Sequence, residues 1–471
     1  MRTKIPLSII ISMLVVNLQA AQDEEPRERV TSVKKVITSV AGSKEKEVKI
    51  VPDILPEATQ TTQEGVPRER FYSVKKAISG VSATPQKELD IVGGFKHMFH
   101  DGKVTGQIRA LSSAYMNDTY QNTYATALGG FVKYELAQYK GFSAAVTFHT
   151  STDIDALSGE GVKRNTDLSS SAQEYEVRSE TYINYSYDDF SIRIGRQVID
   201  TPLADSDDFL MIPNSFKAVV ALYEGEKLTV MAGELQEWQG FDADLDNGWQ
   251  KTGKDGTYFG GLSYSDERVD TNLWVYNING EAGDTTANNS FYADIVGHYH
   301  ISETFFAHAG LQFLKQNELD SSGVASNIYG ATGELVVDGL GFNIAYNHAA
   351  KEANKQSFSG FGGGTLFTSM DSMILDAITL DRSADAWVGG ISYEVGDFNI
   401  LYAYGDFHGD ADSSGAKEHI VEQNFGAEYS RDDDFTLAAI YTINDDKYDN
   451  SANGINGGDW GNVRIFGAYN F

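Results

Sequence analysis

The sequence predicts an all-β fold: one transmembrane antiparallel β-barrel of about 18 strands, with short periplasmic turns and long outer loops. Three observations predict it. Segments of about 8 to 14 residues alternate apolar and polar side chains, the connections between them are alternately short and long, and aromatic residues flank the short connections. Successive side chains of a strand point to opposite faces, so these segments suit a wall between lipid and a wet lumen.

The alternating segments are about eighteen, and bacterial single-chain barrels have an even number of strands. They begin near Lys103, Thr126, Phe142, Tyr175, Phe190, Phe216, Leu228, Tyr258, Val269, Phe291, Phe305, Ile328, Phe342, Ala386, Phe398, Val421, Phe435 and Val463. The short connections are rich in acidic residues and glycine, as tight turns require. They are residues 138–141, 188–189, 224–227, 266–268, 302–304, 338–341, 396–397 and 431–434.

Aromatic residues mark one end of the predicted barrel. Six phenylalanines open strands directly after short turns, and five tyrosines close the strands that enter such turns. They are Phe142, Phe190, Phe305, Phe342, Phe398 and Phe435, then Tyr187, Tyr264, Tyr299, Tyr393 and Tyr429. All have the outward parity, so we expect a ring at one membrane interface, where amphipathic rings prefer to lie. A soluble β-sandwich would bury them on an inner face instead.

The last strand shows the alternation most clearly. Residues 463–471 read VRIFGAYNF, with Val463, Ile465, Gly467, Tyr469 and Phe471 on one parity. We expect this face toward lipid. The aromatic ending resembles the C-terminal signature of bacterial outer-membrane barrels, which implies that Tyr469 and Phe471 form an assembly signal for the barrel-assembly machinery.

The chain before the barrel has a different composition. Residues 1–20 have the charged start, short apolar run and small-residue end of a signal peptide. Residues 21–95 form a predicted periplasmic extension, in which PRERVTSVKK from Pro26 is repeated as PRERFYSVKK from Pro67. Apolar spacing predicts two short amphipathic helices there. Contact with peptidoglycan and a flexible, duplicated leader are the two alternatives. Residues 96–471 form the predicted barrel.

The composition excludes several classes of function. The formal net charge is −30, from 67 acidic and 37 basic residues, which argues against a nucleic-acid partner. There is no cysteine, so disulfides and thiolate metal sites are excluded. The histidines are scattered and lack a neighbouring nucleophile motif, so we expect neither an enzyme nor a cofactor.

Residues 193–219, RIGRQVIDTPLADSDDFLMIPNSFKAV, resemble the segment around the third outer loop of OprD-like porins. KVTGQIRALSSAYM from Lys103 resembles the first strand of that family, and GGGTLFTSMDSMILDA from Gly362 resembles a late loop of its epsilon-proteobacterial members. The resemblance implies an 18-stranded barrel in the outer membrane of a Gram-negative bacterium, surrounded by lipid and lipopolysaccharide. It also implies passive diffusion of small hydrophilic solutes (ions, amino acids, small peptides or carboxylates) through a pore narrowed by the third loop.

Other assignments remain open at this stage. A surface structural or adhesive barrel with incidental conduction is the alternative function, because long outer loops fit either role. A monomer and a homotrimer both fit the sequence.

Parity predicts which charged residues line the pore. The basic set is Arg109, Lys133, Arg178, Arg193, Lys217 and Arg464, with Arg196 joining it if a β-bulge shifts its parity. Opposite them we place four acids of the third loop, Asp200, Asp205, Asp207 and Asp208. Opposed charges across a narrow gap create a transverse field that orients dipolar solutes.

Two weaker metal patterns are present. His298 and His300 share the inward parity of one strand and His308 that of the next, so the three imidazoles could hold Zn, Cu or Ni. We favour wet lumen residues instead. Residues 242–248, DADLDNG, resemble a calcium loop, but the glycine comes one place late and the bidentate Glu is absent. We interpret them as a solvated acidic loop.

Overall fold

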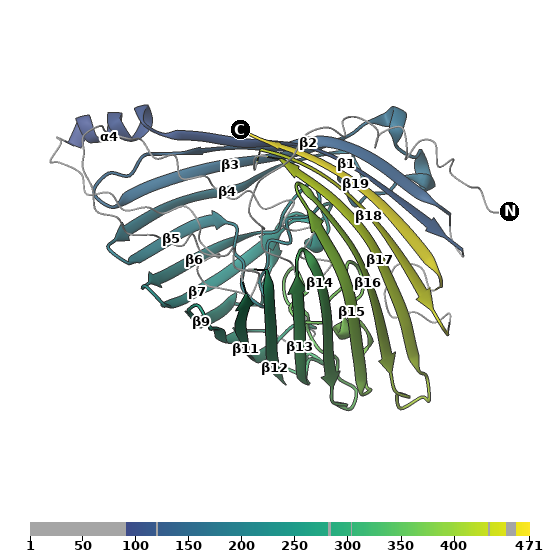
Figure 1. The fold of residues 1–471 in the computed structure, drawn as a ribbon. Coiled ribbons are helices and arrows are strands. Elements are labelled where there is room, and N and C mark those ends of the chain that lie inside the picture. Colours follow the sequence, from purple (N-terminus) through teal and green to yellow (C-terminus); the bar gives the residue numbers. More distant parts are fainter. Residues whose placement is uncertain (1–90, 119–120, 281–283, 303, 432–433, 449–457) are drawn as a thin grey trace.

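The computed structural model describes residues 91–118, 121–280, 284–302, 304–431, 434–448 and 458–471. Eighteen long antiparallel strands form a closed barrel (Figure 1). They are β1 (Lys103–Asn117), β2 (Thr123–Glu135), β3 (Phe142–Asp153), β4 (Glu174–Tyr187), β5 (Phe190–Gln197), β6 (Ser215–Glu224), β7 (Leu228–Gln239), β9 (Thr257–Ser265), β10 (Val269–Ile278), β11 (Asn288–Ser302), β12 (Phe305–Glu318), β13 (Ser326–Val337), β14 (Leu340–Ala349), β15 (Ala384–Val395), β16 (Phe398–Gly409), β17 (Glu418–Arg431), β18 (Phe435–Asp446) and β19 (Trp460–Asn470). The two-residue strand β8 (Gln250–Lys251) pairs with the end of β7.

The first and last strands close the ring. β1 pairs with β2 on one side and with β19 on the other, with Gln107 opposite Asn470. The backbone N–H of Gly106 donates to the carbonyl of Phe471 at 3.0 Å, and the N–H of Phe471 donates back to the carbonyl of Gly106 at 3.0 Å. Among the described residues, each of the eighteen long strands therefore has a hydrogen-bonded neighbour on both sides, as a barrel in lipid requires.

The predicted strands are confirmed, each beginning within three residues of its expected start. Most of the differences have a common cause. Several strands continue into polar sequence toward the long connections, as at Asn288 and Glu418, where the apolar alternation has already ended. The backbone ladder persists there because inter-strand hydrogen bonds do not depend on side-chain type.

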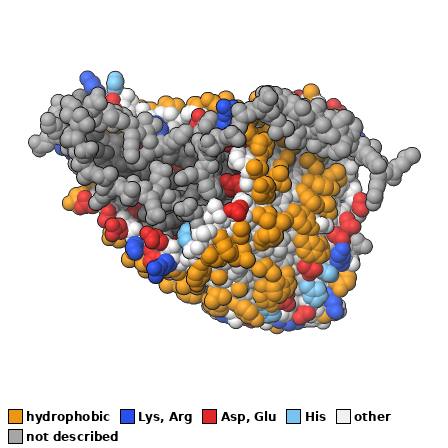
Figure 2. Space-filling model, in the orientation of Figure 1, with side chains coloured by type: hydrophobic (Ala, Val, Ile, Leu, Met, Phe, Trp, Pro, Cys, Tyr) orange, Lys and Arg blue, Asp and Glu red, His pale blue; other side chains and the backbone are white. Residues whose placement is uncertain are grey.

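The outer face carries the expected apolar band. All eleven predicted ring aromatics have the outward parity of their strands, and rings meet across neighbouring strands, as for Phe142 with Tyr185 at 4.8 Å and Phe398 with Tyr429 at 4.9 Å between centroids. Figure 2 shows one side of this band as a broad area of hydrophobic side chains.

Few helical elements accompany the barrel. Helix α4 (Ile91–His100) precedes β1 and is tied to β2 by a hydrogen bond from the Tyr134 hydroxyl to the Phe99 carbonyl at 2.6 Å. Short 3-10 turns lie in the connections at η1 (Asp155–Leu157), η2 (Gly161–Lys163), η3 (Phe241–Ala243) and η4 (Leu375–Ile378). Within the described residues, no helix has the length and apolar character needed to cross a membrane. The predicted signal peptide and duplicated segment lie outside those residues.

Candidate functional site: the interior of the barrel

The interior combines a polar wall with two connections that lie inside it. Inward amides from strands around the ring are buried, among them Asn184, Asn272, Asn347, Asn424 and Asn462. In a membrane barrel the outward side chains face lipid, so amides and charges are expected among the inward side chains that face the lumen.

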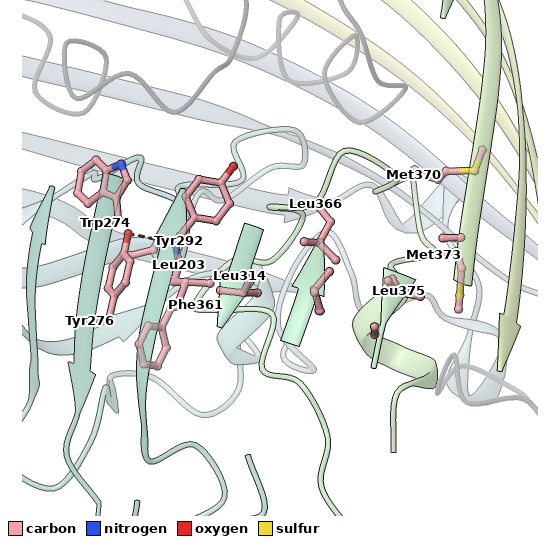
Figure 3. Close-up of a cluster of buried hydrophobic side chains, with 14 of the residues drawn as sticks. Leu203, Trp274, Tyr276, Tyr292, Leu314, Phe361, Leu366, Met370, Met373 and Leu375 are labelled. Atoms are coloured by element: carbon pink, nitrogen blue, oxygen red, sulfur yellow. Dashed lines mark hydrogen bonds between the residues drawn. The ribbon is translucent and has the colours of Figure 1, made fainter. Parts of the chain in front are cut away.

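The connection between β5 and β6, residues 198–214, lies against the inner wall. Arg109 of β1 donates to both carboxylate oxygens of Asp208, at 2.5 and 2.8 Å, and to the carbonyl of Leu210 at 2.9 Å. On the other side, the N–H of Leu203 donates to the hydroxyl of Tyr276 on β10 at 3.3 Å (Figure 3). The loop therefore contacts β1 and β10, which lie in the ring on opposite sides of the strands that the loop connects.

Two of the four acids of this loop accept local hydrogen bonds from its backbone. Asp200 accepts from the N–H of Ser206 at 3.0 Å, and Asp205 accepts from the N–H of Asp207 at 2.7 Å. The expectation that the acids face the basic set across a gap is wrong for Asp208, which contacts Arg109 directly. The pair forms because the loop crosses close enough to the wall for a bidentate contact, which sequence parity does not reveal.

A second connection, residues 350–383 between β14 and β15, also lies inside the barrel. The N–H groups of Ser372 and Met373 donate to the Glu422 carboxylate of β17 at 3.1 and 2.8 Å. Asp371 forms an ion pair with Arg464 of β19 and accepts from the Thr442 hydroxyl at 2.5 Å. The loop thus reaches three neighbouring strands.

Sequence reasoning missed that this second loop folds inward. A signal was available, because a solvated loop has little reason to carry several large apolar residues. Its buried members Phe361, Leu366, Met370, Met373 and Leu375 pack against the inner wall (Figure 3). Burial of each such side chain contributes about 1.5–3 kcal/mol, which favours the inward position.

The two interior loops contact one another. The N–H of Asp205 donates to the carbonyl of Phe361 at 2.9 Å, and the N–H of Phe361 donates to the carbonyl of Leu203 at 2.9 Å. Gly362 has φ +114°, and a Cβ there would lie 2.4 Å from the Asp205 carbonyl oxygen. Only glycine accommodates this backbone conformation and this approach together.

The inward basic side chains gather on one part of the inner wall, with the inward acids Asp153 and Glu180 among them. Arg109, Lys133, Arg193 and Arg464 lie inward on β1, β2, β5 and β19. Lys133 lies 3.7 Å from Glu180, and the Arg193 guanidinium lies over the Tyr182 ring at 4.1 Å from its centroid. Across the ring, Asp270, Asp294 and Glu334 lie inward on β10, β11 and β13, whereas Glu422 of β17 lies two strands from Arg464 of β19.

Three predicted pore residues lie on the outer face instead. In β4, Glu180 pairs with Thr147 but Val177 with His149, so one extra residue forms a bulge. Val177 is consequently buried and Arg178 exposed, the reverse of the predicted parity. Arg196 keeps its outward parity, because its pairing with β4 and β6 shows no bulge. Lys217 pairs with Arg196 and shares that face, so its predicted inward parity is wrong.

The predicted histidine pair is brought together, but each ring has its own carboxylate. His298 lies directly opposite His308, with ring centroids 4.8 Å apart. His298 contacts Asp270 at 3.0 Å, and His308 contacts Glu334 at 3.4 Å. His300 is exposed and packs on Phe306. Among the described residues, no three histidine or acidic side chains are arranged to hold a metal ion.

The acids of residues 242–248 also have protein partners. Asp242 accepts from the Asn214 amide at 2.7 Å, and Asp246 accepts from the N–H of Ser171 at 2.9 Å. These contacts join three connections, which gives the acids a structural role.

Comparison with known proteins identifies the architecture. No family model and no curated protein matches the sequence. Among solved structures, Pseudomonas aeruginosa OpdK with vanillate is 14% identical with a TM-score of 0.65, covering 79% of this chain and 99% of its own. Acinetobacter baumannii OccAB2 is 16% identical with a TM-score of 0.66 (80% and 99%), and Pseudomonas aeruginosa OccK9 is 12% identical with a TM-score of 0.64 (79% and 99%). The chain has the fold of these OprD/Occ porins. The similarity covers the barrel and shows its fold.

Proposed function

We propose that this chain is an outer-membrane porin through which small hydrophilic solutes diffuse passively, in a Gram-negative bacterium. The observation that carries the proposal is the charged inner wall: Arg109, Lys133, Arg193 and Arg464 gather on one part of the ring, and Asp270, Asp294 and Glu334 lie inward on strands across from it. A barrel that served only as a surface scaffold would need no such separation of charge within its lumen.

The interior loops support a channel over an adhesive barrel. Residues 198–214 and 350–383 lie against the inner wall, so much of their surface is turned away from any extracellular partner. We infer that the two loops together narrow the pore. A narrow, low-dielectric passage strengthens the field of the wall charges.

We further propose that zwitterionic and carboxylated solutes are favoured. Their carboxylates would contact the basic wall, most directly at Lys133 and Arg193, while their ammonium groups would face the acidic wall. Arginine and lysine donate charge-assisted hydrogen bonds to carboxylates, and these are stronger than neutral ones.

Planar-bilayer recording tests the proposal. Wild-type protein should conduct, and the double variant K133Q/R193Q should shift the reversal potential in a KCl gradient toward cation preference. The variant K315Q is the control, since Lys315 lies on the outer face and pairs with Glu352 at 3.6 Å. Absence of channels from wild type, or an equal shift in both variants, would contradict the proposal.

A second recording tests the third loop. Replacement of Asp205, Asp207 and Asp208 by Asn should shift the reversal potential toward anions, because these acids lie inside the barrel. Replacement of Asp242, Asp244 and Asp246 should shift it far less, because these side chains are near the solvent. Equal shifts would mean that residues 198–214 do not form the constriction.

A further inference from the structure

Three basic residues gather on the outer face of the barrel, where lipid is expected. Arg196 and Lys217 are directly opposite each other on β5 and β6. Their strand neighbours fix the direction: Gln197 is fully buried inside, whereas Ile194 is 55% exposed outside. Arg178 lies beside them, and Arg196 donates to its carbonyl at 3.4 Å.

An indole ring from the next connection joins the group. Trp249 lies under both cations, with its ring centroid 4.9 Å from the Arg196 guanidinium carbon and 4.6 Å from the Lys217 nitrogen. Cation–π contact holds the two charges side by side at the surface. We call Arg178, Arg196, Lys217 and Trp249 the outer basic cluster.

With Lys251 of β8, the outer basic cluster holds four cations, one more than the outward acids nearest to it. Glu237 forms an ion pair with Lys217, and Lys251 lies opposite Glu237 on β8. Glu176 shares the exposed face of β4, two residues from Arg178, and Glu234 of β7 is also outward, opposite Val219. Like charges directly opposite each other destabilise a sheet, so an anion bound here would reduce the repulsion between Arg196 and Lys217.

The position along the strands indicates the kind of anion. The cluster lies above the outward apolar residues Ile194 and Val219, on the side of the long connections. Elsewhere at that end the outward residues include Asp385, Asp406 and Asp445. In the described strands, apart from Lys251 of β8, Lys315 is the one other outward lysine or arginine toward that end. The basic character is therefore local to β4–β8.

We propose that the outer basic cluster binds the phosphate groups of lipopolysaccharide in the outer leaflet. Guanidinium and ammonium groups donate to phosphate oxygens, and tryptophan prefers the interface between acyl chains and headgroups. Because the cluster borders the apolar band, an acyl chain can lie along Ile194 and Val219 while the phosphate meets the cations. The inference rests on the outer-membrane location proposed above.

Thermal unfolding of the purified full chain in detergent tests the proposal, with lipopolysaccharide as the titrant. Wild type and the K315Q control should be stabilised, and R196Q/K217Q should need about tenfold more lipid for half the shift, since two charge-assisted contacts are lost. Dephosphorylated lipid should stabilise wild type much less. Inorganic phosphate at the same concentration should have no comparable effect, because it lacks the acyl chains.

Three outcomes would overturn the proposal. The first is an equal thermal stabilisation of wild type and R196Q/K217Q by lipopolysaccharide, and the second is an equal stabilisation of wild type by phosphorylated and dephosphorylated lipid. The third is a change of oligomeric state in R196Q/K217Q without lipid, which would mean that the cluster is a contact between copies of the chain. If R196Q/K217Q does not fold, the comparison of lipids on wild type still decides. The conductance of R196Q/K217Q in bilayers free of lipopolysaccharide should equal that of wild type. This measurement separates failure of this inference from failure of the porin proposal.

Discussion

At the scale of single residues, Arg109 shows what parity reveals and what it does not. Its inward position follows from alternation along β1, and the structure places it fully buried on the inner wall. Its partner Asp208 was recognised as a loop acid, yet their bidentate contact depends on the path of the loop, which no local pattern contains. The prediction for Arg178 is wrong for a similar reason, because a one-residue bulge between Val177 and Glu180 gives the two parts of β4 opposite parity.

Loss of Arg109 should release the third loop. In R109Q, Asp208 loses its bidentate partner, a cost of about 1–3 kcal/mol. The chain has no cysteine, so a single L210C substitution can report on the loop with a membrane-impermeant thiol reagent. Leu210 is buried, and we expect labelling to be about tenfold faster or more in the R109Q background. If L210C is labelled no faster in the R109Q background than in the K315Q background, the Arg109–Asp208 pair does not hold the loop in place.

Asp381 should make one outer contact sensitive to acid. Hydrogen bonds from Ser413, with further help from Asn354 and Lys351, lower the pKa of this carboxyl below its usual value. A lowered pKa stabilises the fold above the unfolded value of about 3.9, and that stabilisation is lost as pH falls through the folded pKa. Hydrogen exchange of residues 410–417 should be faster in D381N than in wild type at pH 6. The difference should shrink in strongly acidic solution, and a difference independent of pH would contradict the assignment.

At the scale of elements, the strands were predictable and the interior loops were only partly so. A membrane strand must alternate along its own sequence, so local periodicity suffices to locate it. Residues 198–214 were placed inside by resemblance to a known segment. The inward position of residues 350–383 is not predictable from local sequence, because their apolar side chains are buried against strands that are distant in the sequence.

Gly362 should be essential to the contact between the two loops. G362A would place a Cβ 2.4 Å from the Asp205 carbonyl oxygen in a backbone conformation that side chains rarely adopt. G363A is the matched control, since Gly363 also has positive φ but its nearest neighbour atom is 4.0 Å away. We expect higher single-channel conductance in G362A than in G363A. The same conductance in both would mean that the contact does not set the pore width.

At the scale of the whole molecule, the closing strand should control assembly. Deletion of Phe471 removes both hydrogen bonds to Gly106 and the terminal aromatic side chain. We expect lower levels of the deletion variant in the outer membrane, with normal export to the periplasm. F471A, which keeps the backbone bonds, separates the side chain from the closure. Normal outer-membrane levels of the deletion variant would show that this residue is not part of the assembly signal.

The pairing of β1 with β19 also sets the earliest point at which the barrel can close, because closure needs both strands. Gly106 and Phe471 lie near opposite ends of the described chain, so β1 has no permanent partner on one side until β19 has been synthesised. During that interval the growing sheet presents an unpaired edge, which is a template for aggregation. Contacts so distant in sequence also form slowly. We therefore expect the polypeptide to need protection from aggregation until β19 has been made, and a chain that ends before β19 to keep an exposed sheet edge on β1.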